Sequence, residues 1–276
     1  MQLLGRALIG DTSCHGEIED DRFHVVVGDV FGDHRRNGQS FALDDVDLGV
    51  PLDDVRFVNV MGGFNAPGTT RAPDRVPWWL PKATRWPSGD RCDVHLPASL
   101  TGAFNMESEL AVVVGRPLRA ATPAEAHDAI FGWTVFNDWT AAEFGDFAFV
   151  GLWATGKSMD GFTSWGPWIR RDLTEERVMD GLAIKGYVNG EEAQSGTTRD
   201  YTFTPSEMLS HVSHRIGLFP GDVVALGTPY PAPAVKAGDE ILCEVEEVGV
   251  LTNFVVADTG EPPTLRPRPA AARTRR

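Results

Sequence analysis

The chain has 276 residues, a mass of 30.1 kDa and a formal net charge of −14. Since 42% of its residues are hydrophobic, it can bury a substantial core, which excludes intrinsic disorder for most of its length. An acidic chain repels phosphates, so we predict that neither nucleic acid nor an anionic membrane surface is a partner.

The three cysteines, Cys14, Cys92 and Cys243, are widely spaced and include no CxxC pair. This pattern argues against a disulfide framework and against a structural zinc site. No segment approaches the ~18 apolar residues that a membrane helix needs. The short apolar run at the N-terminus lacks a clear cleavage site, so the sequence predicts a cytoplasmic protein.

The first part of the chain has few regular patterns. Residues 1–55 are acidic and rich in turns, with one good strand candidate at 23–27. Residues 62–90 are rich in glycine, proline and tryptophan, and a loop of that length inside a compact domain is usually functional or mobile. We interpret residues 1–75 as a small N-terminal region, with a lid segment at about 60–90.

From about residue 94 the sequence consists of short β-branched runs separated by glycine and proline turns, a pattern typical of strands. The runs are ELAVVVG, FAFVGLW, LAIKGYVNG, VVALGTP and EILCEVEEVGVLTNFVV. Capping signals predict two helices, at Thr122-Pro123-Ala124-Glu125 and Thr204-Pro205-Ser206-Glu207. We therefore predict a large domain over 76–260, of mixed α/β class but mostly β, followed by a disordered basic tail over 261–276.

Two glutamates, Glu107 and Glu109, lead directly into the apolar run 110–114. On a strand, side chains two residues apart face the same way, so the two carboxylates would lie side by side. Buried carboxylates repel each other, and a hard divalent cation such as Mg²⁺ or Ca²⁺ is the usual solution. The alternative is an exposed strand end with solvated charges, because E-x-E is a common string.

Two further segments carry polar groups next to apolar runs. Asp138 stands between Phe136 and Trp139, where it would provide a third carboxylate ligand or cap a turn. A predicted strand ends in Gly227-Thr228-Pro229, which leaves a hydroxyl and backbone N–H groups free to bind an anion. An ordinary turn between a strand and a loop is the alternative there.

The segment GLWATGKS at 151–158 matches the phosphate-loop pattern GxxxxGK[ST]. That motif requires a following helix whose N-terminus faces the phosphates, but Gly161, Gly166 and Pro167 predict no helix there. We therefore disfavour nucleotide binding. Lys157 would either hold a substrate carboxylate or lie solvated on the surface. The seven histidines show no metal-ligand spacing, and neither GxSxG nor HExxH occurs.

In this order and spacing, these segments resemble the fumarylacetoacetate hydrolase family, in particular members similar to 2-hydroxyhepta-2,4-diene-1,7-dioate isomerase and acylpyruvate hydrolase. The resemblance covers roughly residues 94–256. It rests on the blocks MESELAVVVGR, GWTVFNDWTA, GKSMDGFTSWGPWI, VNGEEAQSG, TPSEMLSHVS, LFPGDVVALGTP and KAGDEILCEVEEVGVLTNFVV.

The resemblance implies a β-roll or barrel of mixed sheets with a few flanking helices around a metal site, usually in a homodimer. It implies an active-site lysine at Lys157 and a substrate-binding turn at Gly227-Thr228. The three carboxylate ligands of a Mg²⁺, Mn²⁺ or Ca²⁺ ion would be Glu107, Glu109 and Asp138.

The chemistry that the resemblance implies is the cleavage or rearrangement of a β-dicarbonyl compound or 2-oxo acid through a metal-bound enolate. C–C bond hydrolysis is marginally favoured over decarboxylation, tautomerisation or isomerisation, and hydration. A non-catalytic scaffold with the same fold is the rival hypothesis.

The sequence departs from the family at two places that handle substrate. The lid usually contains Asn-Tyr followed by a histidine, but no histidine occurs between His34 and His95, and Ala142 replaces an arginine after the metal aspartate. Several tryptophans lie in or beside the active-site blocks, namely Trp139, Trp153, Trp165 and Trp168. We therefore predict a roomier, more aromatic pocket for a larger and less charged substrate, with Trp139 among its contacts.

Overall fold

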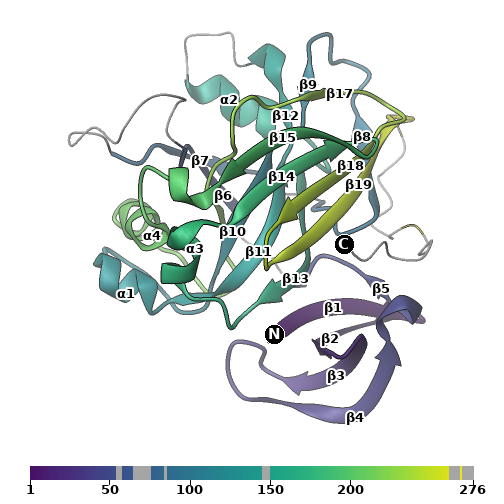
Figure 1. Ribbon diagram of the computed structural model, residues 1–276, viewed down its shortest axis with the longest axis vertical. Helices are drawn as coiled ribbons and strands as arrows, with labels where there is room; N and C mark the ends of the chain where they lie inside the picture. The colour runs from purple at the N-terminus through teal and green to yellow at the C-terminus, as the bar shows by residue number, and fades with distance from the viewer. Residues whose placement is uncertain (54–57, 65–75, 84–85, 145–149, 261–267, 269–276) are drawn as a thin grey trace.

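The computed structural model describes residues 1–53, 58–64, 76–83, 86–144, 150–260 and 268. Most of its elements are strands in mixed sheets, with a few short helices at the edges (Figure 1). The predicted fold class is therefore confirmed. The predicted basic tail over 261–276 lies outside the described residues except for Arg268, and part of the predicted lid at 60–90 also lies outside them.

Four antiparallel strands form a meander at the N-terminus, where the sequence predicted a single strand. They are β1 (Leu3–Ile9), β2 (Thr12–Glu19), β3 (Arg22–Gly28) and β4 (His34–Ala42). Most side chains of β2 and β4 are at least partly exposed, so these strands lack the apolar alternation by which a strand is recognised. The short η1 (Leu43–Asp45) and β5 (Asp47–Leu48) follow.

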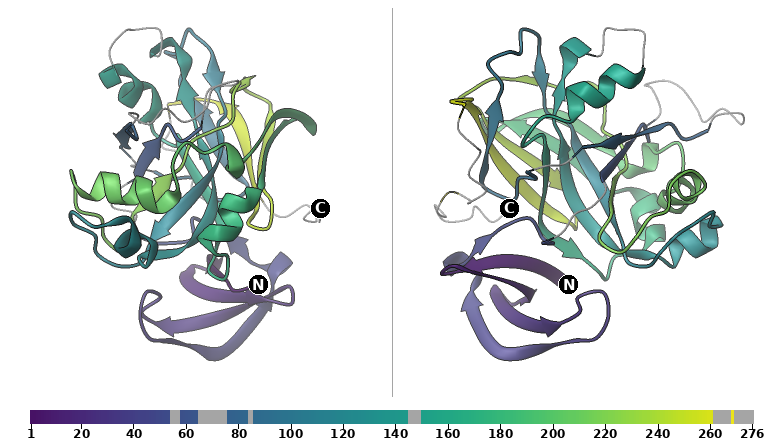
Figure 2. Two further views of the ribbon diagram at one scale, coloured as in Figure 1. Left: turned by 60° about the vertical axis from the view of Figure 1, so that its left-hand side comes forward. Right: turned by 180° about the vertical axis from the view of Figure 1, so that it is seen from behind.

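Figure 2 shows this N-terminal unit set apart at one end of the molecule. It is continuous with the rest through β1, which pairs antiparallel with β13 (Thr163–Arg170). The division of the chain into residues 1–75 and 76–260 stays a prediction.

The largest sheet has eleven strands in the order β4-β3-β2-β1-β13-β11-β10-β16-β6-β7, with β5 paired to β1. Its strands beyond the N-terminal unit include β10 (Ser108–Val114), β11 (Ile130–Asp138), β16 (Val223–Ala225), β6 (Val58–Met61) and β7 (Trp79–Lys82). Every residue of β10 is buried, which explains the apolar run over 110–114.

A five-stranded sheet packs against β10 and β11, so the main core lies between the two sheets. Its order is β15 (Glu191–Thr197), β14 (Ala183–Val188), β18 (Glu240–Val245), β19 (Gly249–Ala257) and β8 (Cys92–Leu96). A small third sheet contains β12 (Thr140–Ala141), β9 (Phe104–Asn105) and β17 (Ala234–Val235).

Both predicted helices begin at their capping boxes. They are α1 (Pro123–His127), capped by Thr122 and Glu125, and α4 (Pro205–Ser213), capped by Thr204 and Glu207. The other short helices are α3 (Glu175–Gly181), η2 (Ala142–Phe144) and η3 (Thr198–Asp200). No helix in the described part of the chain is long and apolar enough to cross a membrane, and Cys14, Cys92 and Cys243 are not joined in disulfides.

The segment FAFVGLW does not form the predicted strand. Residues 147–149 lie outside the described residues, and from Val150 the chain is helical as α2 (Val150–Lys157). A short apolar run does not by itself distinguish a strand from a helix, which is why the sequence misled here. The phosphate-loop pattern therefore lies on a helix, and the next element after Lys157 is the strand β13.

Candidate metal centre and active-site cavity

Three carboxylates converge where two neighbouring strands meet. Glu107 precedes β10, Glu109 lies on β10, and Asp138 is the last residue of the adjacent strand β11. The backbone N–H of Asp138 donates to the carbonyl of Glu107 at 3.0 Å, which fixes the two strand ends together. One carboxylate oxygen from each residue lies within 4.8 Å of the others, so the residues predicted as metal ligands do come together.

The surroundings of these carboxylates suit a hard divalent cation. Glu109 and Asp138 are only 1% exposed, which excludes a solvated strand end. Burial, together with repulsion by Asp138 and Glu107, raises the pKa of Glu109 well above its usual value, and burial also raises the pKa of Glu107. Clustered oxygen ligands whose charges are unfavourable without a counterion match the preferences of Mg²⁺, Mn²⁺ and Ca²⁺.

Lys157 ends helix α2 with its ammonium group among these carboxylates. Its Nζ donates to Glu107 Oε2 at 2.8 Å, to Asp138 Oδ2 at 2.6 Å and to Thr140 Oγ1 at 2.7 Å. Burial alone would lower the pKa of Lys157, but the Asp138 and Glu107 carboxylates outweigh it and hold that pKa above its usual value. Lys157 is therefore a buried cation of the site rather than a solvated surface lysine.

A second lysine, Lys82, also lies at the site, and the sequence analysis did not predict it. It ends β7, its side chain is fully buried, and its Nζ donates to Asp138 Oδ1. Burial is the main cause that lowers the pKa of Lys82, and Asp138 opposes it. No motif marks Lys82, because its partner lies 56 residues further along the chain.

The Gly227-Thr228 turn also reaches the site. The Gly227 N–H donates to Glu109 Oε2 at 2.7 Å, so it holds a carboxylate of the protein rather than staying free. Gly227 has a φ of +110°, and a Cβ there would lie 2.6 Å from the Gly63 nitrogen, so only glycine fits. Thr228 Oγ1 donates to the Ser108 carbonyl at 3.1 Å and lines the cavity.

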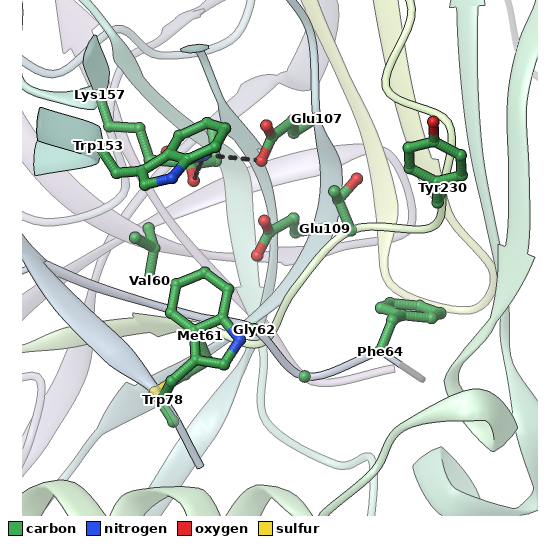
Figure 3. A pocket seen from close by; sticks show the side chains of 13 residues that line it. Val60, Met61, Gly62, Phe64, Trp78, Glu107, Glu109, Trp153, Lys157 and Tyr230 are labelled. Atoms are coloured by element: carbon green, nitrogen blue, oxygen red, sulfur yellow. Dashed lines mark hydrogen bonds and ion pairs between the residues drawn. The ribbon is translucent and has the colours of Figure 1, made fainter. Parts of the chain in front are cut away.

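A cavity of about 500 Å³ opens onto the carboxylates. Figure 3 shows Glu107 and Glu109 between two tryptophans on one side and Tyr230 and Phe64 on the other. All seven histidines lie in the described residues, and none of them lines the cavity. The lining residues are Val60, Met61, Gly62, Gly63, Phe64, Trp78, Glu107, Glu109, Asp138, Trp153, Lys157, Thr228 and Tyr230.

Trp139 does not line this cavity. Its indole is fully buried, donates to Ser164 Oγ at 2.7 Å and stacks on Phe104 with 5.1 Å between ring centroids. The reason is alternation, because neighbouring residues in an extended chain point to opposite faces and Asp138 takes the cavity face. A substrate contact for Trp139 thus stays a prediction with no place in the described lining.

Of the other tryptophans singled out in the sequence, only Trp153 lines the cavity. Trp165 is fully buried, and Trp168 donates to the Val248 carbonyl at 2.7 Å. Ala142 begins η2 and is not part of the lining. The rest of the aromatic lining comes from residues that were not singled out in the sequence, above all Trp78, which lies within the glycine-, proline- and tryptophan-rich stretch 62–90.

The family comparison covers most of the chain. Residues 30–256 match the family described as Fumarylacetoacetate (FAA) hydrolase C-terminal, and residues 4–51 match the family described as Rv2993c-like, N-terminal. The crystal structure of 5-carboxymethyl-2-hydroxymuconate delta-isomerase from Mycobacterium smegmatis superposes with a TM-score of 0.82 at 30% identity, covering 94% of this chain and 100% of that one.

Two curated relatives match over shorter regions. The chain is 38% identical over 157 residues to the 4-hydroxyphenylacetate degradation bifunctional isomerase/decarboxylase of Salmonella dublin, covering 56% of this chain and 36% of that protein. It is also 38% identical over 161 residues to the mitochondrial oxaloacetate tautomerase FAHD2A of Homo sapiens, covering 54% and 50%. The chain thus spans at most half the length of these two relatives, but on the match over 30–256 it belongs to the fumarylacetoacetate hydrolase family.

Proposed function

We propose that this chain is a divalent-metal-dependent enzyme that isomerises a 2-oxo acid or β-dicarbonyl compound through an enolate. The observation that carries the proposal is the group of three carboxylates within 4.8 Å of one another at the cavity. Glu107, Glu109 and Asp138 would hold the metal ion, and Lys157 lies against two of them.

A divalent cation at these carboxylates would polarise the oxo group of the substrate and stabilise negative charge on its oxygen. Lys157 stays protonated beside Glu107 and Asp138, so it adds a fixed positive charge at the end of the cavity where the substrate carboxylate would bind. The Gly227 N–H orients the Glu109 carboxylate, and the Thr228 hydroxyl lies beside it at the cavity wall.

Isomerisation takes precedence over the C–C hydrolysis that the sequence marginally favoured. Isomerisation moves one proton between the carbon next to the oxo group and the oxo oxygen, by way of the enolate, so the substrate gains and loses no other atom. Hydrolysis needs an activated water in addition, and the described residues that line the cavity include no histidine to activate it. Relatives described as a tautomerase and as a bifunctional isomerase/decarboxylase support this order and make decarboxylation the second candidate.

The test follows the enol absorbance of a panel of 2-oxo acids and acylpyruvates with metal-stripped protein, before and after Mg²⁺ or Mn²⁺ is added. We expect metal to accelerate loss of the enol signal with no change in substrate mass. Mass spectrometry separates the alternatives, because cleaved products indicate hydrolysis and loss of CO₂ indicates decarboxylation. Calorimetric metal binding without turnover of any panel member would favour the non-catalytic scaffold.

A further inference from the structure

The charged and the apolar side chains of the cavity lie in different parts of its lining. Its charged lining groups, Glu107, Glu109, Asp138 and Lys157, belong to the carboxylate cluster. Figure 3 shows aromatic side chains on two sides of that cluster. The apolar side chains of the lining are Val60, Met61, Phe64, Trp78, Trp153 and Tyr230. A substrate whose 2-oxo acid group reaches the carboxylates therefore lays the rest of its structure along aromatic surface.

Two of these aromatic side chains are exposed where they meet the cavity. Trp78 is 55% exposed and Tyr230 is 76% exposed. Large aromatic groups that stay open to solvent beside a cavity usually mark ligand surface, because covering them with another apolar group is favourable. The amphipathic ring of each also provides a flat face for stacking.

Glycine at position 62 allows Trp78 to occupy the cavity wall. A Cβ on Gly62 would lie 1.9 Å from Trp78 Cε2, so any larger residue would displace the indole. The Gly62 N–H donates to the Trp78 carbonyl at 3.2 Å, which holds the two residues against each other. The position of the indole is thus built into the β6–β7 pairing.

In the described lining, no further cation is available to pair with a second carboxylate of a substrate. Lys157 is the one cation among the described lining residues, and all three of its N–H donors point to Glu107, Asp138 and Thr140. A distal carboxylate would lose its hydration against aromatic walls without gaining an ion pair, which is costly. Cavities of about 300–1,000 Å³ hold ligands of drug size, so one of about 500 Å³ has room for a bulky substituent.

We infer that the substrate is a 2-oxo acid with a single carboxylate whose far end is an aromatic or bulky apolar group that packs against the aromatic lining of Trp78, Trp153, Phe64 and Tyr230. The inference rests on the proposed function, because it assumes that the 2-oxo acid group binds at the carboxylate cluster.

The experiment compares phenylpyruvate with oxaloacetate on the Mn²⁺-loaded full chain. It measures kcat/KM for loss of the enol and, independently of turnover, the Kd of each acid by calorimetry. We expect phenylpyruvate to be preferred by about twofold to tenfold, the size of one aromatic stacking contact. Equal or better binding of oxaloacetate overturns the inference, even if both acids are turned over.

Variants locate the preference in the cavity. Trp78→Ala should remove most of the preference for phenylpyruvate while oxaloacetate binding stays within about twofold, and Trp78→Arg should favour the dicarboxylate. The matched control is Phe219→Ala, because Phe219 is similarly exposed at 57% but lies outside the cavity lining. An unchanged preference in both Trp78 variants refutes the aromatic wall. Binding of phenylpyruvate without isomerisation refutes the proposed function and leaves this inference standing.

Discussion

Asp138 and Glu109 lie in one cluster but have opposite electrostatic surroundings. Asp138 accepts hydrogen bonds from two buried lysines, Lys82 and Lys157. Burial alone would raise the pKa of Asp138, but the two lysines outweigh it and hold that pKa below its usual value. Glu109 accepts from the Gly227 N–H and is repelled by Asp138 and Glu107. Removing the negative charge should therefore destabilise the metal-free protein at Asp138 but not at Glu109.

Asp138→Asn should destabilise the metal-free protein by about 3–5 kcal/mol, because it leaves two buried ammonium groups short of a counterion. Urea unfolding of metal-stripped wild type and variant measures the difference. A loss below about 1 kcal/mol would show that Lys82 and Lys157 do not depend on this carboxylate for their burial.

Glu109→Gln should keep or slightly increase the stability of the metal-free protein, because it removes one of three mutually repelling charges and keeps an oxygen that accepts from Gly227. It should weaken Mn²⁺ binding at least about tenfold in calorimetry, because a ligand charge is lost. Glu125→Gln is the matched control, since Glu125 is exposed, caps α1 and is not among the described cavity-lining residues. Undiminished Mn²⁺ binding in the Glu109 variant would remove Glu109 from the ligand set.

At the level of elements, Glu175 joins three helices at one edge of the molecule. It lies on α3, accepts from the Ser206 N–H of α4 at 2.7 Å, and pairs with His127 Nδ1 of α1 at 2.7 Å. The hydrogen bond to Glu175 is the main cause that raises the pKa of His127 above its usual 6.5. The charge-dependent part of this contact therefore stabilises the fold only while His127 is protonated.

His127→Gln should lower the free energy of unfolding by less than about 1 kcal/mol, because solvent screens a histidine that is 44% exposed. A raised pKa in the folded state gives a contribution that is complete below pH 6.5 and is lost as the pH rises through the folded-state pKa. Urea unfolding of wild type and variant at pH 5.5 and 9 should show a difference that disappears at the higher pH. A difference of equal size at both values would mean that the contact does not depend on charge.

Elements with strong local signals were predictable from the sequence, and those defined by long-range contacts were not. The two capping boxes placed the starts of α1 and α4 because each satisfies the first backbone N–H groups of its helix locally. The run FAFVGLW was misread because a short apolar segment fits a buried strand or a buried helix equally well. Of the N-terminal strands only β3 was predicted, and β1, β2 and β4 were missed because pairing between neighbours, not apolar alternation, defines them.

At the scale of the whole molecule, the carboxylate cluster couples metal binding to pH and stability. Burial, followed by repulsion from Asp138 and Glu107, raises the folded-state pKa of Glu109 above 4.5. Protonation of Glu109 therefore stabilises the metal-free protein fully below pH 4.5, and this contribution is lost as the pH rises through the folded-state pKa. A metal ion competes with that proton, so its stabilising effect should grow over the same range.

Mn²⁺ at about 100 times its Kd should stabilise the protein by about 2.7 kcal/mol. Thermal unfolding with and without Mn²⁺ from pH 5 to pH 8 should show a gap in Tm that widens as the pH increases. A gap that stays constant or narrows would show that the cation does not displace a proton from this cluster.

The homodimer and the cytoplasmic location stay predictions, and sedimentation of the purified chain checks the former.

How much of the site the sequence reveals depends on how its residues are spaced. Glu107 and Glu109 are recognisable because they are two residues apart beside an apolar run, and Asp138 because it is an acidic residue between Phe136 and Trp139. Lys82 and Tyr230 are not recognisable, because they reach the site through the packing of elements distant in sequence. Trp139 was predicted as a substrate contact because it stands next to Asp138 in the sequence. Neighbouring residues of a strand, however, point to opposite faces.

The pairing of β1 with β13 has a consequence for solubility. β13 is bonded to β11 on one side and to β1 on the other, and its Ile169 and Trp165 are fully buried. Without β1, β13 would be open at Ile169 and Arg170, and an open strand edge with apolar neighbours is the kind of surface on which chains associate edge to edge. The N-terminal meander contributes no residue to the described cavity lining, yet it covers that edge, and its last strand, β4, presents arginines to solvent instead.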